Sequence, residues 1–195
     1  MRQTTATRRD SMGERILGMD PGLETTGFGL VTVTDGRPAH VRSGVVTTRA
    51  QEPLPERLVA LHTQLAALLD ATAPHTLVLE SLYSHYQHPI TAILMGHARG
   101  VICLAAAQRQ IPVVCYLPTH VKKAVTGHGH ATKAQVQGMV TAMLGLSHRP
   151  EPHDVSDALA LALAHAQTLR EPRLVAALRP SRRRTLPAAL QEALR

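Results

Sequence analysis

The sequence predicts an α/β fold built on a mixed β-sheet, and two observations lead to this prediction. Near the N-terminus, three strand-like runs follow one another with only turn pairs between them, which indicates an antiparallel meander. Beyond the meander, helical stretches alternate with short apolar runs, which is typical of strands covered by helices. With 195 residues and 44% hydrophobic content, the chain is long enough for one domain with a substantial core.

The meander comes first and most of the helices follow. Its strands are expected at 15–19, 27–34 and 39–47, with the turn pairs Pro21-Gly22 and Asp35-Gly36 between them. Leucines at helical spacing then predict a helix over 53–73. The remaining expected elements are a strand at 76–80, a helix at 90–110, a strand at 113–116, and helices at 118–125, 132–145 and 154–169, with Thr132 as N-cap and Gly145 as stop of the helix before the last.

Composition sets the expected domain limits. Residues 1–14 are polar and without periodicity, so they are expected to form a disordered N-terminal extension. Residues 15–169 form the predicted folded domain. Residues 170–195 are rich in Arg and Pro and are expected to form a basic, mobile tail.

Charge and cysteine content narrow the class of protein. Lys and Arg number 21 against 14 Asp and Glu, which gives a net charge of +7 and favours a polyanionic partner such as nucleic acid. The two cysteines, Cys103 and Cys115, lack CxxC spacing and are expected to be free thiols in a reducing compartment. We find no signal-peptide core and expect no apolar stretch long enough to span a bilayer, so a cytoplasmic protein is predicted.

Four carboxylates stand where the predicted fold would bring them to one place. Asp20 and Glu80 each end an apolar strand-like run, and Asp154 and Asp157 open the last helix three residues apart. Oxygen ligands hold Mg²⁺ or Mn²⁺, and a pair of such ions can clamp both oxygens of a phosphodiester during displacement. The pattern therefore predicts a two-metal site for phosphodiester cleavage.

Each acid also has an ordinary interpretation. Asp20 with Pro21 and Gly22 is compatible with a simple turn, and Glu80 with a solvated charge at a strand end. Asp154 and Asp157 resemble a capping pair that favours the helix dipole. Because these explanations would have to hold independently at every position, we prefer the joint metal site. His153, beside Asp154, is either a further ligand or proton carrier, or a peripheral histidine.

Other residues near these acids are candidates for substrate contact. Lys122 and Lys133 flank a Gly/His loop at 126–131 and are candidates for gripping the scissile phosphate. That loop, with only two histidines, suits phosphate approach better than a transition-metal site. Tyr83 and Tyr86 follow Glu80 and are candidates for stacking on DNA bases, or for packing their own loop.

Gly96 and Gly100 lie four residues apart in the predicted helix over 90–110. Because Gly inside a helix costs about 1 kcal/mol relative to Ala, a compensating close helix contact is expected. That contact lies either within the core or across a homodimer.

Several segments in register resemble one known family. They are ILGMDPG at 16–22, ESLY at 80–83, GHARGV at 96–101, VK at 121–122, KAQV at 133–136 and DVSDALA at 154–160. In this order and spacing, over about residues 15–167, the sequence resembles the RuvC family of Holliday junction resolvases, in the RNase H-like nuclease superfamily.

The resemblance implies an RNase H-like fold, a five-stranded mixed sheet flanked by helices, and a homodimer. It implies paired symmetric nicks in four-way junction DNA, with Asp20, Glu80, Asp154 and Asp157 holding two divalent cations, Mg²⁺ or Mn²⁺. Lys122 and Lys133 would contact phosphates near the cut, Tyr83 would probe the junction centre, and the helix containing Gly96 and Gly100 would form the dimer contact. A branch-migration motor and its junction-binding adaptor are implied as partners.

The chain departs from the family pattern at three places. Tyr83 stands where Phe is frequent, His97 stands where Gln is common, and the extension before Arg15 is unusual. Three alternatives are weighed: a nuclease acting on RNA or RNA–DNA hybrids, a sugar-kinase-like or actin-like ATPase, and a junction-binding protein without catalysis. The GHARG segment at 96–100 and the pair Asp154 and Asp157 favour the resolvase over the first, and the complete set of four acids argues against the third. The ATPase class needs duplicated domains and phosphate loops that 195 residues do not accommodate. Cleavage tests with and without metal separate these alternatives.

Overall fold

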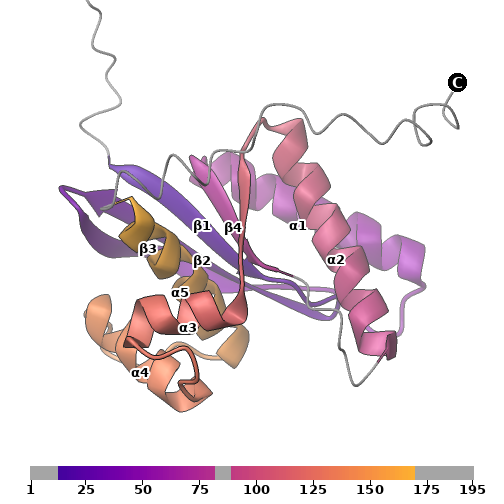
Figure 1. The fold of residues 1–195 in the computed structure, drawn as a ribbon. Helices are drawn as coiled ribbons and strands as arrows, with labels where there is room; N and C mark the ends of the chain where they lie inside the picture. Colours follow the sequence, from indigo (N-terminus) through magenta and orange to yellow (C-terminus); the bar gives the residue numbers. More distant parts are fainter. Residues whose placement is uncertain (1–12, 82–88, 170–195) are drawn as a thin grey trace, which may run out of the picture.

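A computed structural model gives the structure of the chain at residues 13–81 and 89–169. Figure 1 shows one β-sheet with helices on both faces. In chain order the elements are β1 (Glu14–Asp20), β2 (Thr25–Thr34), β3 (Arg37–Thr47), α1 (Leu54–Thr72), β4 (Thr76–Glu80), α2 (Pro89–Gln108), β5 (Val113–Tyr116), α3 (Pro118–Thr126), α4 (Lys133–Met143) and α5 (His153–Thr168).

The sheet has five strands in the order β3-β2-β1-β4-β5. β1, β2 and β3 pair antiparallel, as the two turn pairs predict, while β4 runs parallel to β1 and β5 parallel to β4. The predicted five-stranded mixed sheet is therefore confirmed. The parallel pairing of β1 with β4 brings the carboxyl ends of these two strands to the same edge of the sheet.

The two faces of the sheet build two separate hydrophobic clusters, because strand side chains alternate between faces. On β1, Leu17 and Met19 join the cluster formed with α1 and α2, whereas Ile16 joins the cluster formed with α3, α4 and α5. On β4, Val78 belongs to this second cluster. Asp20 and Glu80, two residues further along their strands than Gly18 and Val78, are thus directed to the α5 face.

Glycines allow α5 to lie unusually close to β1 and β2. A Cβ atom at Gly18 would collide with the backbone carbonyl of Ala158, and one at Gly27 with the backbone carbonyl of Asp154. Gly27 is also the partner of Asp20 in the β1–β2 ladder. The glycines therefore fix how near the first turn of α5 comes to the end of β1.

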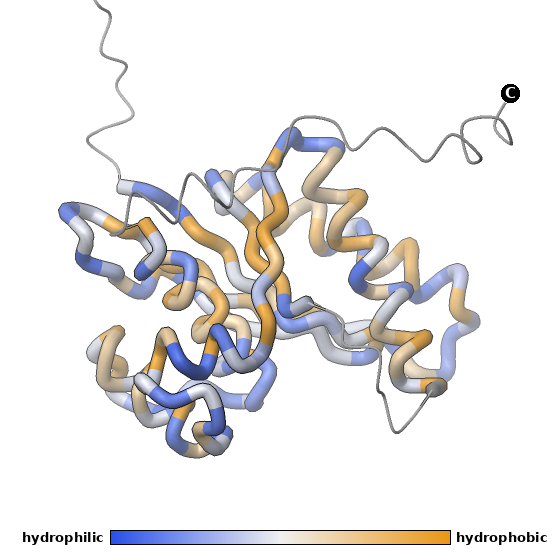
Figure 2. The backbone as a smooth tube through the Cα atoms, in the orientation of Figure 1, coloured by the Kyte–Doolittle hydropathy of each residue, from blue (hydrophilic) through white to orange (hydrophobic). Residues whose placement is uncertain are grey.

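α2 differs from α5 in being only partly covered. It packs against the α1 face of the sheet through Ala98, Ile102, Ala105 and Ala106, while Ile93 is 60% exposed. Figure 2 shows apolar residues along much of this helix. Residues Ile90–Gln108 have a hydropathy of 1.6, and 22% of the most apolar window is buried. By length and composition this stretch is sufficient to cross a membrane, so the expectation that no such stretch exists is wrong. The helix meets the length and composition of a membrane span because it is long and carries apolar residues on its exposed side as well as on its buried side.

The structure confirms the type and order of the predicted elements between β1 and α5, with ends shifted by one to two residues. Thr132 caps α4 in a capping box with Gln135, and Gly145 follows the helix with φ 60°. Both cysteines are free thiols. The predicted extension and tail lie, apart from residues 13 and 14, outside the described residues.

Candidate functional site

The candidate site lies at the carboxyl ends of the two central parallel strands. Asp20 is the last residue of β1 and Glu80 the last of β4, one position beyond the paired residues Met19 and Leu79. Asp20 is half-buried, whereas Glu80 is exposed. The sequence pattern of an acid after an apolar run thus places both carboxylates at neighbouring positions, as predicted.

α5 brings Asp154 and Asp157 to the same edge. The helix begins at His153, and Pro152 is its N-cap without a side-chain hydrogen bond. Asp154 therefore lies inside the first turn and is not the capping residue that the alternative interpretation required. The close approach of α5 at Gly27 holds Asp154 beside the end of β1.

Three of the four acids line one cavity together with both candidate lysines. The cavity has a volume of about 350 Å³, and its lining includes Asp20, Glu80, Asp157, Lys122 and Lys133. Lys133 Nζ lies 3.4 Å from Asp157 Oδ2. Asp154 is not among the lining residues, although its charge acts on Asp20. Acidic and basic groups from five elements, β1, β4, α3, α4 and α5, thus converge on one cavity.

The electrostatics confirm that these groups act on one another. Burial, followed by the charges of Asp157, Asp154 and Glu80, raises the pKa of Asp20 from 3.8 to about 7, against the opposing effect of Lys133. The pKa of Glu80 is raised too, by desolvation and by Asp157, and lowered by Lys133, Lys122 and Arg99. Although the Glu80 side chain is exposed, the cavity walls still desolvate its carboxylate. Negative charge is crowded here, so the site favours a cation.

The donor set suits hard divalent cations. Carboxylate oxygens are the ligands that Mg²⁺ and Mn²⁺ prefer, and a bound cation would offset both the burial and the repulsion that raise the pKa of Asp20. Over residues 13–81 and 89–169, no group of three or more His, Cys, Asp or Glu side chains is already arranged to hold an ion. Binding at these acids therefore requires their side chains to turn toward a common centre.

A buried polar contact fixes α3, which carries Lys122, relative to β5 and α5. The Tyr116 hydroxyl shares a 2.8 Å hydrogen bond with His165 Nδ1, and the Tyr116 ring stacks on His120 with centroids 4.8 Å apart. Desolvation lowers the pKa of His165, which favours the neutral imidazole. Tyr116 thus ties β5, α3 and α5 together.

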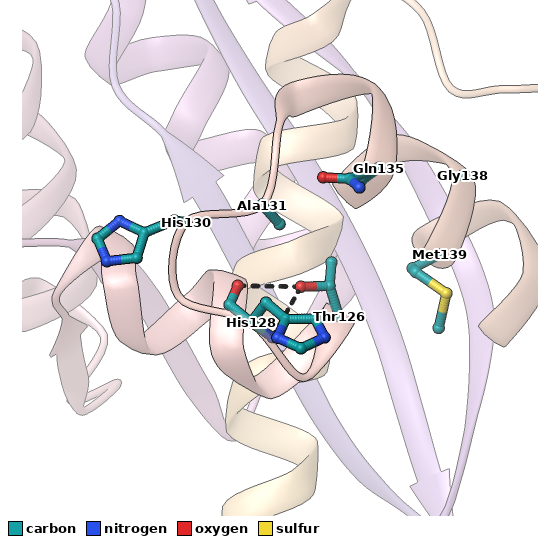
Figure 3. Close-up of a pocket in the computed structure, with 7 residues that line it drawn as sticks. All are labelled: Thr126, His128, His130, Ala131, Gln135, Gly138 and Met139. Atoms are coloured by element: carbon teal, nitrogen blue, oxygen red, sulfur yellow. Dashed lines mark hydrogen bonds between the residues drawn. The ribbon is translucent and has the colours of Figure 1, made fainter.

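The Gly/His loop forms a second hollow on the α3–α4 side. His128, His130 and Gln135 are among the residues that line this cavity of about 470 Å³. Figure 3 shows the two imidazole rings directed to different places, so they do not form a metal pair. The His128 N–H donates to Thr126 Oγ1 at 3.2 Å, which closes the loop on itself.

The remaining candidates are not gathered at the acidic cavity. Tyr83 and Tyr86 lie outside the described residues. His153 is exposed at the first position of α5 and does not line the cavity. Among the residues that the structure describes, no atom lies within 4 Å of a Cβ added at Gly96 or Gly100, so the expected close contact within the core is not found there for either glycine.

Sequence reasoning missed Arg99, Tyr116 and Gly27 as individual contributors. Arg99 bonds the backbone of Glu80, Tyr116 joins three elements, and Gly27 supports Asp154. In the sequence, Arg99 was noted only as a member of the GHARGV segment at 96–101, with no role of its own. Gly27 had a weak signal, since Gly in a strand often marks close backbone approach.

Comparisons with known proteins agree with this geometry. The family described as "Crossover junction endodeoxyribonuclease RuvC" matches residues 16–165. A protein of that name from Rhodopirellula baltica is 48% identical over 157 residues, which cover 80% of this chain and 88% of the relative. Its counterpart from Thermomicrobium roseum is 44% identical over 161 residues, 82% and 97% of the two chains.

Solved structures show the same relationship. The Thermus thermophilus protein described as "RuvC in complex with Holliday junction substrate" superposes with a TM-score of 0.75 at 35% identity, covering 80% of this chain and 95% of that one. The yeast mitochondrial Holliday junction resolvase shares the fold, with a TM-score of 0.60 at 15% identity and coverage of 83% and 82%. The fold is thus RNase H-like, and the chain belongs to the RuvC family of crossover junction endodeoxyribonucleases.

Proposed function

We propose that this protein is a structure-selective endonuclease that resolves four-way DNA junctions by paired symmetric nicks, in homologous recombination and DNA repair. One observation carries the proposal: Asp20, Glu80 and Asp157 line a single cavity together with Lys122 and Lys133. Acids that favour cations and lysines that favour phosphate are both needed at a scissile phosphodiester. The name of the family and the junction-bound Thermus relative support the same substrate.

In this proposal, Asp20, Glu80, Asp154 and Asp157 hold two divalent cations, Mg²⁺ or Mn²⁺. Bound cations would supply an activated water and neutralise charge on the leaving oxygen, giving 5′-phosphate and 3′-hydroxyl ends. Asp20 is the central ligand, because all three other acids act on its charge. Lys122 and Lys133 bind the phosphate oxygens and oppose the negative charge that builds up during displacement.

Junction binding draws on the basic surface and on a second copy of the chain. The net charge of +7 attracts the DNA backbone. The open positions at Gly96 and Gly100, beside exposed Ile93 and Leu104, support α2 as the homodimer contact. Tyr83 and Tyr86 are proposed to stack on bases near the junction centre. A branch-migration motor and its adaptor are the proposed protein partners, and the cytoplasm the proposed compartment.

The test compares wild type with Asp20→Asn on a labelled mobile four-way junction, a linear duplex and an RNA–DNA hybrid, each in EDTA, Mg²⁺ or Mn²⁺. Wild type should give metal-dependent paired nicks on the junction alone. Asp20→Asn should lose on the order of 10³-fold in rate, because ion-mediated charge stabilisation is worth several kcal/mol. Junction affinity in EDTA should be retained.

Asp70→Asn is the matched control, since Asp70 is an exposed acid paired with Arg109 away from the cavity. It should cut like wild type. Wild-type binding without cutting in every metal would instead favour a non-catalytic junction-binding protein. Cutting of the hybrid would move the chain to an RNA-directed activity.

A further inference from the structure

Arg99 reaches from α2 to the ends of two neighbouring strands beside the acidic cavity. Its Nη1 donates to the backbone carbonyl of Glu80 at 2.5 Å, and its Nη2 donates to Cys115 Sγ at 2.9 Å. Cys115 is the β5 partner of Leu79 in the parallel ladder. The guanidinium, a planar group with several fixed donors, therefore bridges β4 and β5 where both strands end.

The contact fixes one particular peptide group. The peptide between Glu80 and Ser81 accepts from Arg99 through its oxygen, and its N–H donates to the Tyr116 carbonyl at 2.7 Å. Both polar atoms of this peptide are thus held, one by α2 and one by β5. Because a peptide group is planar, holding both atoms fixes the direction in which the Glu80 backbone leaves the strand.

Arg99 does not neutralise the Glu80 side chain by a direct ion pair. Among the described residues, its hydrogen bonds go to a backbone oxygen and a thiol, so the Glu80 carboxylate stays available for a cation. Lys133 and Lys122 influence that carboxylate more than Arg99 does. Arg99 therefore holds the backbone of Glu80 and leaves the Glu80 carboxylate unpaired by its guanidinium.

We propose that Arg99 is a positioning residue that holds the Glu80–Ser81 peptide and thereby directs the Glu80 carboxylate toward the cavity that it shares with Asp20 and Asp157. The inference rests on the proposed function, since it gives Glu80 a place in the cation site. Outer contacts that orient a metal ligand commonly change metal affinity or activity by 10- to 100-fold.

Two variants separate positioning from charge. Arg99→Lys keeps the positive charge but, as a single compact ammonium, does not span the carbonyl and the thiol in the same geometry. Arg99→Ala removes both charge and contacts. Positioning predicts that both variants bind Mn²⁺ about 10-fold more weakly in calorimetric titration without DNA. A role through charge alone predicts tighter Mn²⁺ binding by Arg99→Ala and wild-type binding by Arg99→Lys.

Cleavage and junction binding complete the test. Both Arg99 variants should lower kcat by roughly 10- to 100-fold and leave junction affinity in EDTA unchanged. Arg109→Ala is the matched control: this arginine follows α2 and pairs with Asp70 on α1, so it reports general loosening of the helix. It should retain both Mn²⁺ affinity and kcat.

Three outcomes would overturn the inference: wild-type Mn²⁺ binding by Arg99→Lys, losses in Arg109→Ala equal to those in Arg99→Ala, or junction affinity that falls in step with cleavage. Thermal unfolding shows whether each variant is folded, and Arg99→Lys keeps the test decisive if Arg99→Ala is not. Because Mn²⁺ binding is measured without DNA, failure of wild type to cut junctions would count against the proposed function separately.

Discussion

The two helices that border the candidate site use glycine in opposite ways. Under α5, Gly18 and Gly27 sit on the strands, and any added Cβ would strike the helix backbone. On α2, Gly96 and Gly100 sit on the helix itself, and an added Cβ would meet nothing within 4 Å. The first pair is explained by packing inside this chain. Packing against the other described residues does not explain the second pair.

The same contrast holds for burial. α5 is covered along nearly its whole length, including the polar His165, because strands and two helices surround it. α2 leaves Ile90, Ile93 and Leu104 exposed. A buried helix is positioned by its own chain, so the backbone that carries Asp154 and Asp157 is fixed. A half-covered helix leaves an apolar surface that favours association.

The largest expected effect comes from Gly27→Ala. The methyl group would press on the backbone of Asp154, which has no flexible end to move aside. We expect a loss of about 3 kcal/mol in the free energy of unfolding, at the upper end of overpacking effects. Cleavage should fall roughly 100-fold, since misplacing reacting groups by an ångström has effects of that size. Urea unfolding and junction cleavage measure the two losses. If Gly27→Ala unfolds and cleaves like wild type, the close approach of α5 to the strands is not needed, and the contrast with α2 is lost.

The intermediate effect is a pH-dependent change in the free energy of unfolding, caused by the raised pKa of Asp20. Asp20 has a pKa of about 7 in the folded protein against an ordinary 3.8. Between these values the folded chain keeps a proton that the unfolded chain releases, so unfolding free energy falls as pH rises from about 4 to 7. Asp20→Asn removes this loss and should stabilise the metal-free protein at pH 8 by on the order of 2 kcal/mol, but barely below pH 4.

Thermal unfolding in EDTA at pH 8 and below pH 4 measures this effect. One kcal/mol corresponds to roughly 2–4 °C in a protein of this size. The control is Asp70→Asn, because Asp70 is exposed and its pKa is lowered by Arg109, the opposite direction. An equal change for Asp20→Asn at both pH values would contradict the raised pKa of Asp20, and with it the combined effect of burial and of the neighbouring acids.

The smallest effect is expected from Gly100→Ala on α2. In an isolated protomer the substitution should stabilise the helix by up to about 1 kcal/mol, since space is available. In a dimer that uses this surface, the added methyl group should raise the dissociation constant about 10-fold, equivalent to about 1.4 kcal/mol. Sedimentation equilibrium together with thermal unfolding separates the two. Unchanged association would place the subunit contact elsewhere.

Local sequence patterns predicted much of the fold and part of the site. The meander, the parallel strands and the helices follow from periodicity and turn pairs, and the ends of β1 and β4 bring Asp20 and Glu80 together. The catalytic and metal-binding roles of these residues stay predictions.

Other features could not be predicted because they depend on contacts between distant residues. The Arg99 bond to Cys115 and the Tyr116 bond to His165 join different elements, and no local spacing indicates them. The exposed apolar side of α2 was missed for a related reason. Periodicity shows which residues are apolar, but not whether the chain has another element to cover them.

The spread of the acids along the chain has a consequence for synthesis. Asp20 lies in the first strand, Glu80 in the fourth, and Asp154 and Asp157 in the last described helix. Domains fold as their residues emerge from the ribosome, and a nascent chain that ends before residue 153 lacks α5. Such a chain has only two of the four acids and no helix to close the cavity. A nuclease built in this order would stay harmless to DNA until its folding is nearly finished.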